Sequence, residues 1–159
     1  MALGNEMAEM ENVLEIRGLL KNLFASQRLA VLATLATGGH PYTNLVAFTE
    51  TDSLKSLLFV TGRDTQKYSN AITAGKVAIL VDSRTNQVSD LSTAIAVTAL
   101  GIVEEVPAEK RDSLVEIYVS KHPHLLNFAN NTANALMNVR VADYIIASFD
   151  KVTILHVGD

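Results

Sequence analysis

The chain opens with a segment whose apolar residues recur at the spacing of an α-helix. Between Glu9 and Gln27 they fall at every third or fourth position, so that one face of the helix is apolar and covers a core. Gly18 lies inside this segment and weakens the helix slightly. We expect an amphipathic helix over 9–27, preceded by a frayed start over residues 1–8.

After this helix the pattern changes to short apolar runs separated by glycine-rich or polar turns, as is typical of β-strands. Thr37-Gly38-Gly39 joins the first two runs and predicts a β-hairpin. Gly101 lies within a long run and indicates a bulge. The predicted strands are Leu29–Ala36, Pro41–Phe48, Leu57–Thr61, Lys76–Asp82, Thr93–Val106, Val139–Phe149 and Lys151–Val157.

Helices are predicted at two places between these strands. Residues 65–74 form a short helix, which Gly75 closes as a C-cap. Pro107 opens a second helix, which stops at His122-Pro123. Segment 125–137 is ambiguous, and its Asn-rich middle indicates short helical turns in a loop. Because the strands come in runs and do not alternate with helices, we expect a mainly β (α+β) fold, a closed or half-open antiparallel barrel, as one domain over 1–159.

The composition narrows the classes of function. Of 159 residues, 48% are hydrophobic and 19% are charged, which is typical of a globular protein. The net charge of -4 and the absence of Trp argue against nucleic acid and against an anionic membrane as partners. The acidic N-terminus lacks a signal-peptide pattern, and the longest nearly apolar run, Ala94–Val103, is too short to span a bilayer. We expect a cytoplasmic protein.

Few residues indicate chemistry of their own. The chain has no cysteine, which excludes disulfides, thiol catalysis and thiolate metal sites. Of the histidines, only His122 and His124 are close in sequence. No acidic residue stands beside them, so we expect surface histidines at a helix end and predict no metal site. Patterns for a nucleophile elbow, a Rossmann turn or a P-loop are missing from the sequence, and no catalytic residue is assigned.

The stretch Leu57–Lys67 could hold an anion. A buried strand passes through Gly62 into a helix, whose first turn has unpaired N–H groups and the positive end of the dipole. Arg63, Thr65 and Lys67 add two cations and a hydroxyl. We hypothesise a phosphate site; the alternative is an exposed turn with Asp64 as the N-cap and two solvated cations.

A second polar cluster, Asp82–Asn86, follows the next strand. The helix between the two strands could bring their polar ends to the same side, so that both clusters flank one ligand. The alternative is a polar turn in which Asp82 makes an Asx-type bond to nearby backbone.

Three segments in this order resemble the pyridoxamine 5′-phosphate oxidase-like family of FMN-binding split-barrel proteins: AVLATLATGGHPYTNLVAF, LLFVTGRDTQKYSNAITAGKVAILV and DSRTNQVSDLSTAIAVTALGIVEEV. The likeness covers about residues 25–106 closely and the C-terminal part less specifically. It implies an antiparallel six- to seven-stranded split β-barrel with peripheral helices, and a homodimer with FMN at the subunit interface.

The resemblance also implies which residues bind FMN. Thr43, Asn44 and Leu45 lie on the strand that faces the flavin ring. Thr61, Arg63, Thr65 and Lys67 match the segment that holds the ribityl phosphate, and Ser83, Arg84 and Asn86 match one that reaches the flavin or its phosphate.

The resemblance favours an FMN-dependent oxidoreductase that acts on a small-molecule substrate or electron donor. A non-catalytic flavin carrier or redox sensor, and a haem- or tetrapyrrole-handling protein of the same fold, are the alternatives. The vitamin-B6 oxidases carry an Arg-rich C-terminal stretch where this sequence has VTILHVGD, so oxidation of pyridoxamine phosphate is not expected.

Overall fold

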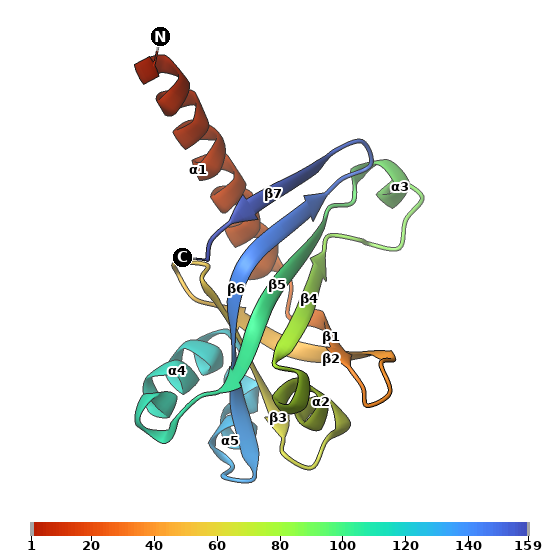
Figure 1. Cartoon of the computed structure of the whole chain (residues 1–159), viewed down its shortest axis with the longest axis vertical. Coiled ribbons are helices and arrows are strands. Elements are labelled where there is room, and N and C mark those ends of the chain that lie inside the picture. The colour runs from red at the N-terminus through yellow and green to blue at the C-terminus, as the bar shows by residue number, and fades with distance from the viewer. Residues whose placement is uncertain (1, 159) are drawn as a thin grey trace.

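The computed structural model describes residues 2–158, which form a sheet flanked by helices (Figure 1). The strands are β1 Leu29–Leu35, β2 Pro41–Glu50, β3 Ser56–Gly62, β4 Lys76–Asp82, β5 Ala96–Glu105, β6 Asn134–Ala147 and β7 Val152–His156. The helices are α1 Ala2–Ser26, α2 Gln66–Ala74, α3 Asp90–Thr93, α4 Ala108–Lys121 and α5 Leu126–Asn130, with a 3-10 turn at Pro123–Leu125.

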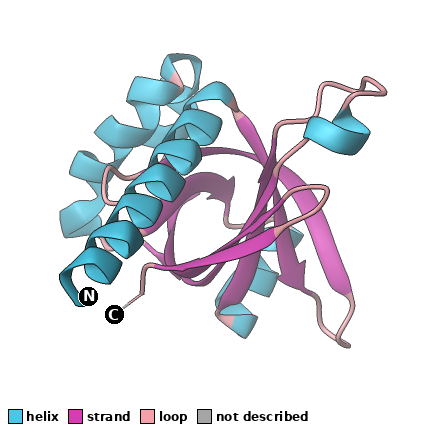
Figure 2. Ribbon diagram, turned by 90° about the horizontal axis from the view of Figure 1, so that it is seen from above, coloured by secondary structure: helices cyan, strands magenta, loops and turns pink. Residues whose placement is uncertain are grey.

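The strands close into an antiparallel barrel. Their order is β3-β2-β1-β4-β5-β6-β7, and an additional pairing of β3 with β6 closes six of them into a ring, with β7 outside it (Figure 2). Each barrel strand alternates inward and outward residues, so β1 buries Ala30, Leu32 and Thr34 and turns the residues between them outward. The predicted mainly β barrel with peripheral helices is confirmed.

The barrel interior is packed by aromatic and branched side chains from both sheet and helix. Phe24 of α1 packs edge-on against Phe48 at 5.7 Å and lies 5.7 Å from the ring of Tyr144. The hydroxyl of Tyr144 donates to the carbonyl of Leu54 at 2.7 Å, so this buried phenol has its partner. α1 covers the barrel through its C-terminal half only, and its other half extends beyond the sheet, with Leu14 63% exposed.

A smaller apolar cluster lies between the sheet and the helices α4 and α5. Val115 and Tyr118 of α4 and Ala129 of α5 pack there on Leu58 and Val60 of β3. Because inward and outward residues alternate along a strand, β3 contributes to the barrel core with one face and to this second cluster with the other. α4 and α5 are thereby held beside the C-terminal end of β3.

Most element boundaries agree with the prediction, and the bulge at Gly101 is confirmed by a shift of register between Leu100 and Gly101. A Cβ at Gly101 would overlap the carbonyl oxygen of Arg140, so only glycine fits. Three boundaries and one element differ from the prediction. α1 begins at Ala2, so residues 2–8 are helical where a frayed start was expected. α3 interrupts the loop after β4 and contains Thr93, so β5 begins at Ala96. β6 begins at Asn134 because its first residues pair with the end of β3.

The expectation of a surface histidine at 122 was also wrong. His122 is 6% exposed, and its Nε2 donates to the carbonyl oxygen of Phe48 at 2.7 Å. Burial lowers the pKa of His122, which favours the neutral ring. His122 is therefore a core residue with its hydrogen bond satisfied, whereas His124 is exposed as expected.

Candidate functional site

The corner between β3 and α2 is built around two threonines. Thr65 is the N-cap of α2 and accepts from the N–H of Tyr68 at 3.3 Å, so the alternative with Asp64 as the cap is wrong. Its Oγ1 donates to the carbonyl of Gly62 at 2.8 Å and lies 2.9 Å from Oγ1 of Thr61. Both hydroxyl protons are thus used inside the corner. Of the first turn of α2, the N–H of Tyr68 is capped by Thr65, and those of Gln66 and Lys67 have no carbonyl four residues before them within the helix and remain open to a ligand.

A cavity of about 390 Å³ opens at this corner. Its volume lies within the range of roughly 300–1,000 Å³ that is usual for small-molecule sites. It brings together four of the predicted residues, Leu45, Thr61, Thr65 and Lys67. The complete lining is Leu45, Val46, Ala47, Val60, Thr61, Gly62, Asp64, Thr65, Lys67, Tyr118, Leu125, Phe128 and Asn134.

The far wall of this cavity comes from residues that the sequence did not identify as part of a site. It is formed by Tyr118 of α4, Leu125 of the 3-10 turn and Phe128 of α5. Burial raises the pKa of Tyr118 to about 12, so the phenol is neutral at ordinary pH. The apolar stripe of α4 was the only signal in the sequence, and it indicated packing. Its position beside the cavity depends on how α4 docks on β3.

Arg63 lies beside the cavity, but its guanidinium is engaged elsewhere. Nε donates to a carboxylate oxygen of Glu105 at 3.1 Å, Nη2 pairs with the same carboxylate, and Nη1 donates to the carbonyl of Thr132 at 2.6 Å. The other oxygen of Glu105 accepts from the hydroxyl of Tyr68 at 2.7 Å. The hydrogen bond from Arg63 lowers the pKa of Glu105, and the hydrogen bond to Glu105 raises the pKa of Tyr68. Arg63 therefore fastens the corner to β5 and to the segment before β6.

The predicted ring-facing residues lie on β2 and point to two sides. Thr43 and Leu45 face outward, and Leu45 is 65% exposed. Asn44 points to the opposite side because successive side chains of a strand alternate. Its Oδ1 is buried and has no hydrogen-bond partner among the described residues. Leu45 alone of the three lines the cavity.

The second polar cluster is not brought to this cavity. β3 and β4 are separated by β2 and β1 and run in opposite directions, so their C-terminal ends lie at opposite ends of the barrel, beside α2 and α3 (Figure 1). The hypothesis that the helix between β3 and β4 brings their polar ends to the same side was wrong within one chain. β2 and β1 lie between the two strands in the sheet.

Within the second cluster the side chains serve the turn itself. Asp82 accepts from the N–H of Arg84 at 3.0 Å, the Asx-type bond that was the alternative, and also pairs with its guanidinium at 3.1 Å. Ser83 accepts from the N–H of Ile95 at 2.9 Å, and Asn86 adopts a left-handed φ of 62°. Arg84 lines a separate cavity of about 400 Å³ with Leu80, Asp82, Leu91, Ala94, Ile95, Ala96, Ala147, Ser148 and Phe149.

In the described part of the chain, no group of three or more His, Asp or Glu side chains is placed to hold a metal ion. None of the described helices is long and apolar enough to cross a membrane.

Comparison with known proteins gives one family and a set of similar folds. Residues 16–144 match the family model described as pyridoxamine 5′-phosphate oxidase. No curated protein matches the sequence. Among solved structures, General Stress Protein 26 from Bacillus anthracis str. Sterne is 13% identical with a TM-score of 0.68, over 89% of this chain and 98% of that one.

Two further structures are similar in fold. A heme binding protein from Mycobacterium smegmatis has a TM-score of 0.75 at 14% identity, over 85% of this chain and 55% of that chain. An FAD-binding protein from Mesorhizobium loti has a TM-score of 0.62 at 14% identity, over 79% of this chain and 89% of that chain. The chain therefore spans about half the length of the mycobacterial protein.

Proposed function

The chain belongs to the pyridoxamine 5′-phosphate oxidase family, and from this premise we propose that it binds FMN and acts as an oxidoreductase on a small molecule. The observation that carries the proposal is the corner between β3 and α2. There Lys67 and Thr65, the N-cap residue of α2, line one cavity of about 390 Å³ at a helix N-terminus, which favours an anion. This is a place for the phosphate end of the cofactor, with the apolar wall of α4 and α5 beside it.

The residues present fit such a cofactor. Lys67 supplies the charge, and the first turn of α2 supplies N–H donors. Because the hydroxyl protons of Thr61 and Thr65 are already donated within the corner, these threonines shape the first turn and offer lone pairs. Asn44 has a buried acceptor without a partner among the residues described, but it points to the side of β2 opposite Leu45 and does not line this cavity.

Arg63 has a supporting role in this proposal. Its ion pair with Glu105 neutralises its charge and leaves Lys67 as the main cation at the phosphate. Arg63 then holds the corner in shape through Glu105 and Thr132.

The outer face of the barrel supports a dimer. Leu45, Val31 and Leu80 stand opposite one another on β2, β1 and β4, so their side chains form a row on one face. Leu29 and Leu100 on the same face are 52% and 39% exposed. An apolar sheet face of this extent is typical of an interface, and in a symmetric dimer the same face of a second copy covers it.

A dimer would also bring the two polar clusters to one site. Within one chain Lys67 and Arg84 line different cavities at opposite ends of the barrel. We propose that Arg84, with Ser83 and Asn86, completes the FMN site of the partner subunit across the face that contains Leu45.

When bound, the flavin supplies the electron transfer, and the protein positions it and excludes water. A flavin carrier or redox sensor is the alternative that shares this site. A haem-handling protein is the second alternative, and its support is the fold that this chain shares with a heme binding protein. Two histidines are engaged in the structure, His122 with Phe48 and His156 with Asp143 at 2.5 Å, which leaves His40 and His124 as the free candidates for an axial ligand.

The visible spectrum of the purified protein tests the cofactor, because flavin bands and a Soret band are distinct. Titration with FMN and riboflavin then tests the phosphate site. Lys67→Met should weaken FMN by about tenfold or more and leave riboflavin unchanged, since a charge-assisted hydrogen bond contributes roughly 1.5–3 kcal/mol. Lys76→Met, an exposed lysine at the start of β4, is the matched control.

Three outcomes would count against the proposal. A protein that neither carries nor takes up flavin refutes the cofactor. Equal losses of FMN and riboflavin in Lys67→Met refute the phosphate placement alone. A flavin that nicotinamide nucleotides reduce but no acceptor reoxidises would favour a carrier over an enzyme.

A further inference from the structure

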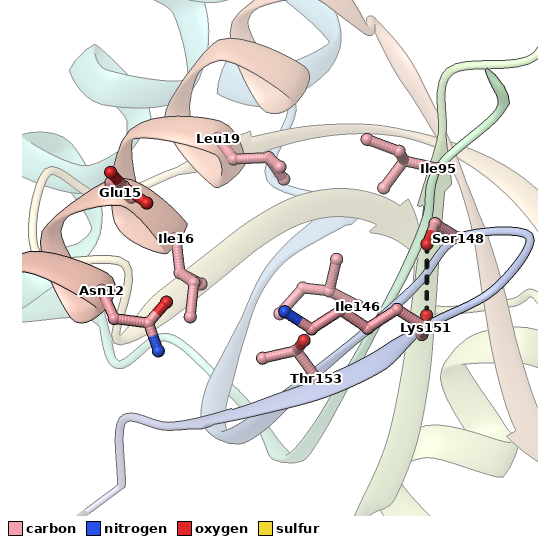
Figure 3. Close-up of a pocket in the computed structure, with 9 residues that line it drawn as sticks. All are labelled: Asn12, Glu15, Ile16, Leu19, Ile95, Ile146, Ser148, Lys151 and Thr153. Atoms are coloured by element: carbon pink, nitrogen blue, oxygen red, sulfur yellow. Dashed lines mark hydrogen bonds between the residues drawn. The ribbon is translucent and has the colours of Figure 1, made fainter. Parts of the chain in front are cut away.

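A second cavity lies between α1 and the strands β5 to β7, away from the corner at β3 and α2. Its volume is about 260 Å³, and it shares no lining residue with the cavity at β3 and α2, whereas Ile95 and Ser148 also line the cavity that contains Arg84. Figure 3 shows α1 on one side of it and the β6–β7 hairpin on the other. The lining is Asn12, Glu15, Ile16, Leu19, Ile95, Ile146, Ser148, Lys151 and Thr153.

The floor of this cavity is aliphatic. Ile16, Leu19, Ile95 and Ile146 are half-buried and pack against the main core of the barrel. They come from α1, from the residue before β5 and from β6, so the floor is fixed by three elements. It contains no aromatic ring and no charged group. An aliphatic chain laid on it would remove apolar surface of both partners from water.

The rim carries hydrogen-bond donors that have no acceptor among the described residues. The side chains of Lys151, Asn12 and Thr153 have no hydrogen bond or ion pair to another described residue. Lys151 extends along the cavity from the hairpin toward α1, and the Asn12 amide lies across from its ammonium (Figure 3).

The position of Lys151 is set by the hairpin turn. Its carbonyl accepts from the N–H of Ser148 at 2.9 Å and from the Ser148 hydroxyl at 3.3 Å, so Ser148 holds the turn and is not free for a ligand. Glu15 is the one acidic side chain on the rim, and its carboxylate lies apart from the ammonium of Lys151 (Figure 3).

We infer that this cavity binds a small aliphatic monocarboxylate, with its chain on the isoleucine floor and its carboxylate against Lys151 and Asn12. The single cation matches one negative charge, and an amide and a hydroxyl supply further hydrogen bonds. An amine of the same shape is disfavoured because it would meet Lys151. The volume lies just below the range of roughly 300 Å³ and above for drug-sized ligands, so the occupant is short.

The test uses the full-length protein with whatever cofactor it carries, and hexanoate, hexanamide and hexylamine as probes. Hexanoate should shift the methyl NMR signals of Ile16, Ile95 and Ile146 in a saturable way. Hexanamide should bind about tenfold more weakly, because it keeps the shape and loses the charge. Lys151→Met, which keeps most of the stem, should weaken hexanoate by a similar factor and leave hexanamide unchanged.

Lys110→Met, an exposed lysine on α4, is the control and should leave all three probes unchanged. No methyl shift up to about 10 mM hexanoate would overturn the site. Equal binding of hexanoate and hexanamide, or unchanged hexanoate binding in Lys151→Met, would overturn the carboxylate assignment. None of these results depends on FMN, so the inference and the proposed function can fail separately.

Discussion

At the scale of single residues, Glu105 connects the candidate site to the rest of the fold. Its carboxylate accepts from Arg63 and from Tyr68, and the hydrogen bond from Arg63 is the main reason that its pKa is lowered. Glu105→Gln should reduce the free energy of unfolding by about 1 kcal/mol at neutral pH, the usual contribution of such a bond. Urea denaturation measures it, and Glu104→Gln, next to it and half exposed, is the control.

This contribution should depend on pH in one direction. Because the pKa of Glu105 is lower in the folded state than in the unfolded chain, its contribution to stability is complete above the ordinary glutamate pKa of about 4.3. The contribution is lost as the pH falls through the lower pKa of the folded state. The difference between wild type and Glu105→Gln should therefore shrink below about pH 4. A constant difference across that range would show that the ion pair with Arg63 has no energetic role.

His122 gives a second pH dependence, with the sign set by burial. Because its pKa is lowered in the folded state, the unfolded chain binds a proton more readily. Stability should be full above the ordinary histidine pKa of about 6.5 and should fall as pH drops through the lower folded value. Denaturation of His122→Gln should lack this part of the pH profile, whereas His124→Gln should keep it. An NMR titration of His122 at or above its ordinary pKa would contradict the prediction.

Residue types at the corner were predictable, but their partners were not. Gly62, Thr65 and Lys67 lie close together in the sequence, so a strand-to-helix corner with a cation could be recognised locally. Arg63 pairs with Glu105, which lies 42 positions further along the chain. No local pattern reports such a contact, because it depends on the end of β5 reaching the start of α2.

At the scale of elements, Gly101 is required by packing against the neighbouring strand, whereas Gly18 only lowers the helix propensity of α1. Gly101→Ala should cost about 2 kcal/mol or more, because its Cβ would meet the backbone of Arg140 and the strand pair cannot move apart cheaply. Gly18→Ala in α1 meets nothing within 4 Å and should stabilise the protein by up to about 1 kcal/mol. Thermal unfolding of the two variants measures both signs. A neutral Gly101→Ala would mean that the bulge is not needed.

Elements with a strong local signal were predictable, and elements set by pairing were less so. β4 was predicted to the residue, because Gly75 ends α2 with a φ of 69° and KVAILVD follows at once. β6 was expected to begin at Val139, yet it begins at Asn134 because Asn134–Met137 pair with β3. The asparagines in that region have turn-forming propensity, and the tertiary pairing overrides it.

At the scale of the whole molecule, the strand order changes how the candidate site must be assembled. One hypothesis from the sequence was that the clusters of Lys67 and Arg84 flank one ligand, because each follows a buried strand. The order β3-β2-β1-β4 puts two strands between them and opposes their directions. Strand order is a long-range property, which helix and strand periodicity do not encode. The single domain over 1–159 and the FMN residues themselves stay predictions.

A heterodimer of two defective chains tests the assembly. If each FMN site takes Lys67 from one protomer and Arg84 from the other, Lys67→Met and Arg84→Met homodimers have two defective sites each. Their heterodimer, isolated with two different affinity tags, should have one intact site and one doubly defective site, and should bind about one FMN per dimer with wild-type affinity.

The same heterodimer excludes the competing arrangement. If Lys67 and Arg84 served one site within a single protomer, both sites of the heterodimer would be defective and no high-affinity site would appear. If Arg84 served no site, the Arg84→Met homodimer would itself bind two FMN with wild-type affinity. Leu100→Asp should separate the dimer, because it puts an unpaired charge on the outer face at a residue that does not line the cavity at β3 and α2. In that background, gel filtration should give a monomer and the recovered FMN site should vanish. Recovery in a monomer would refute assembly of the site across the dimer.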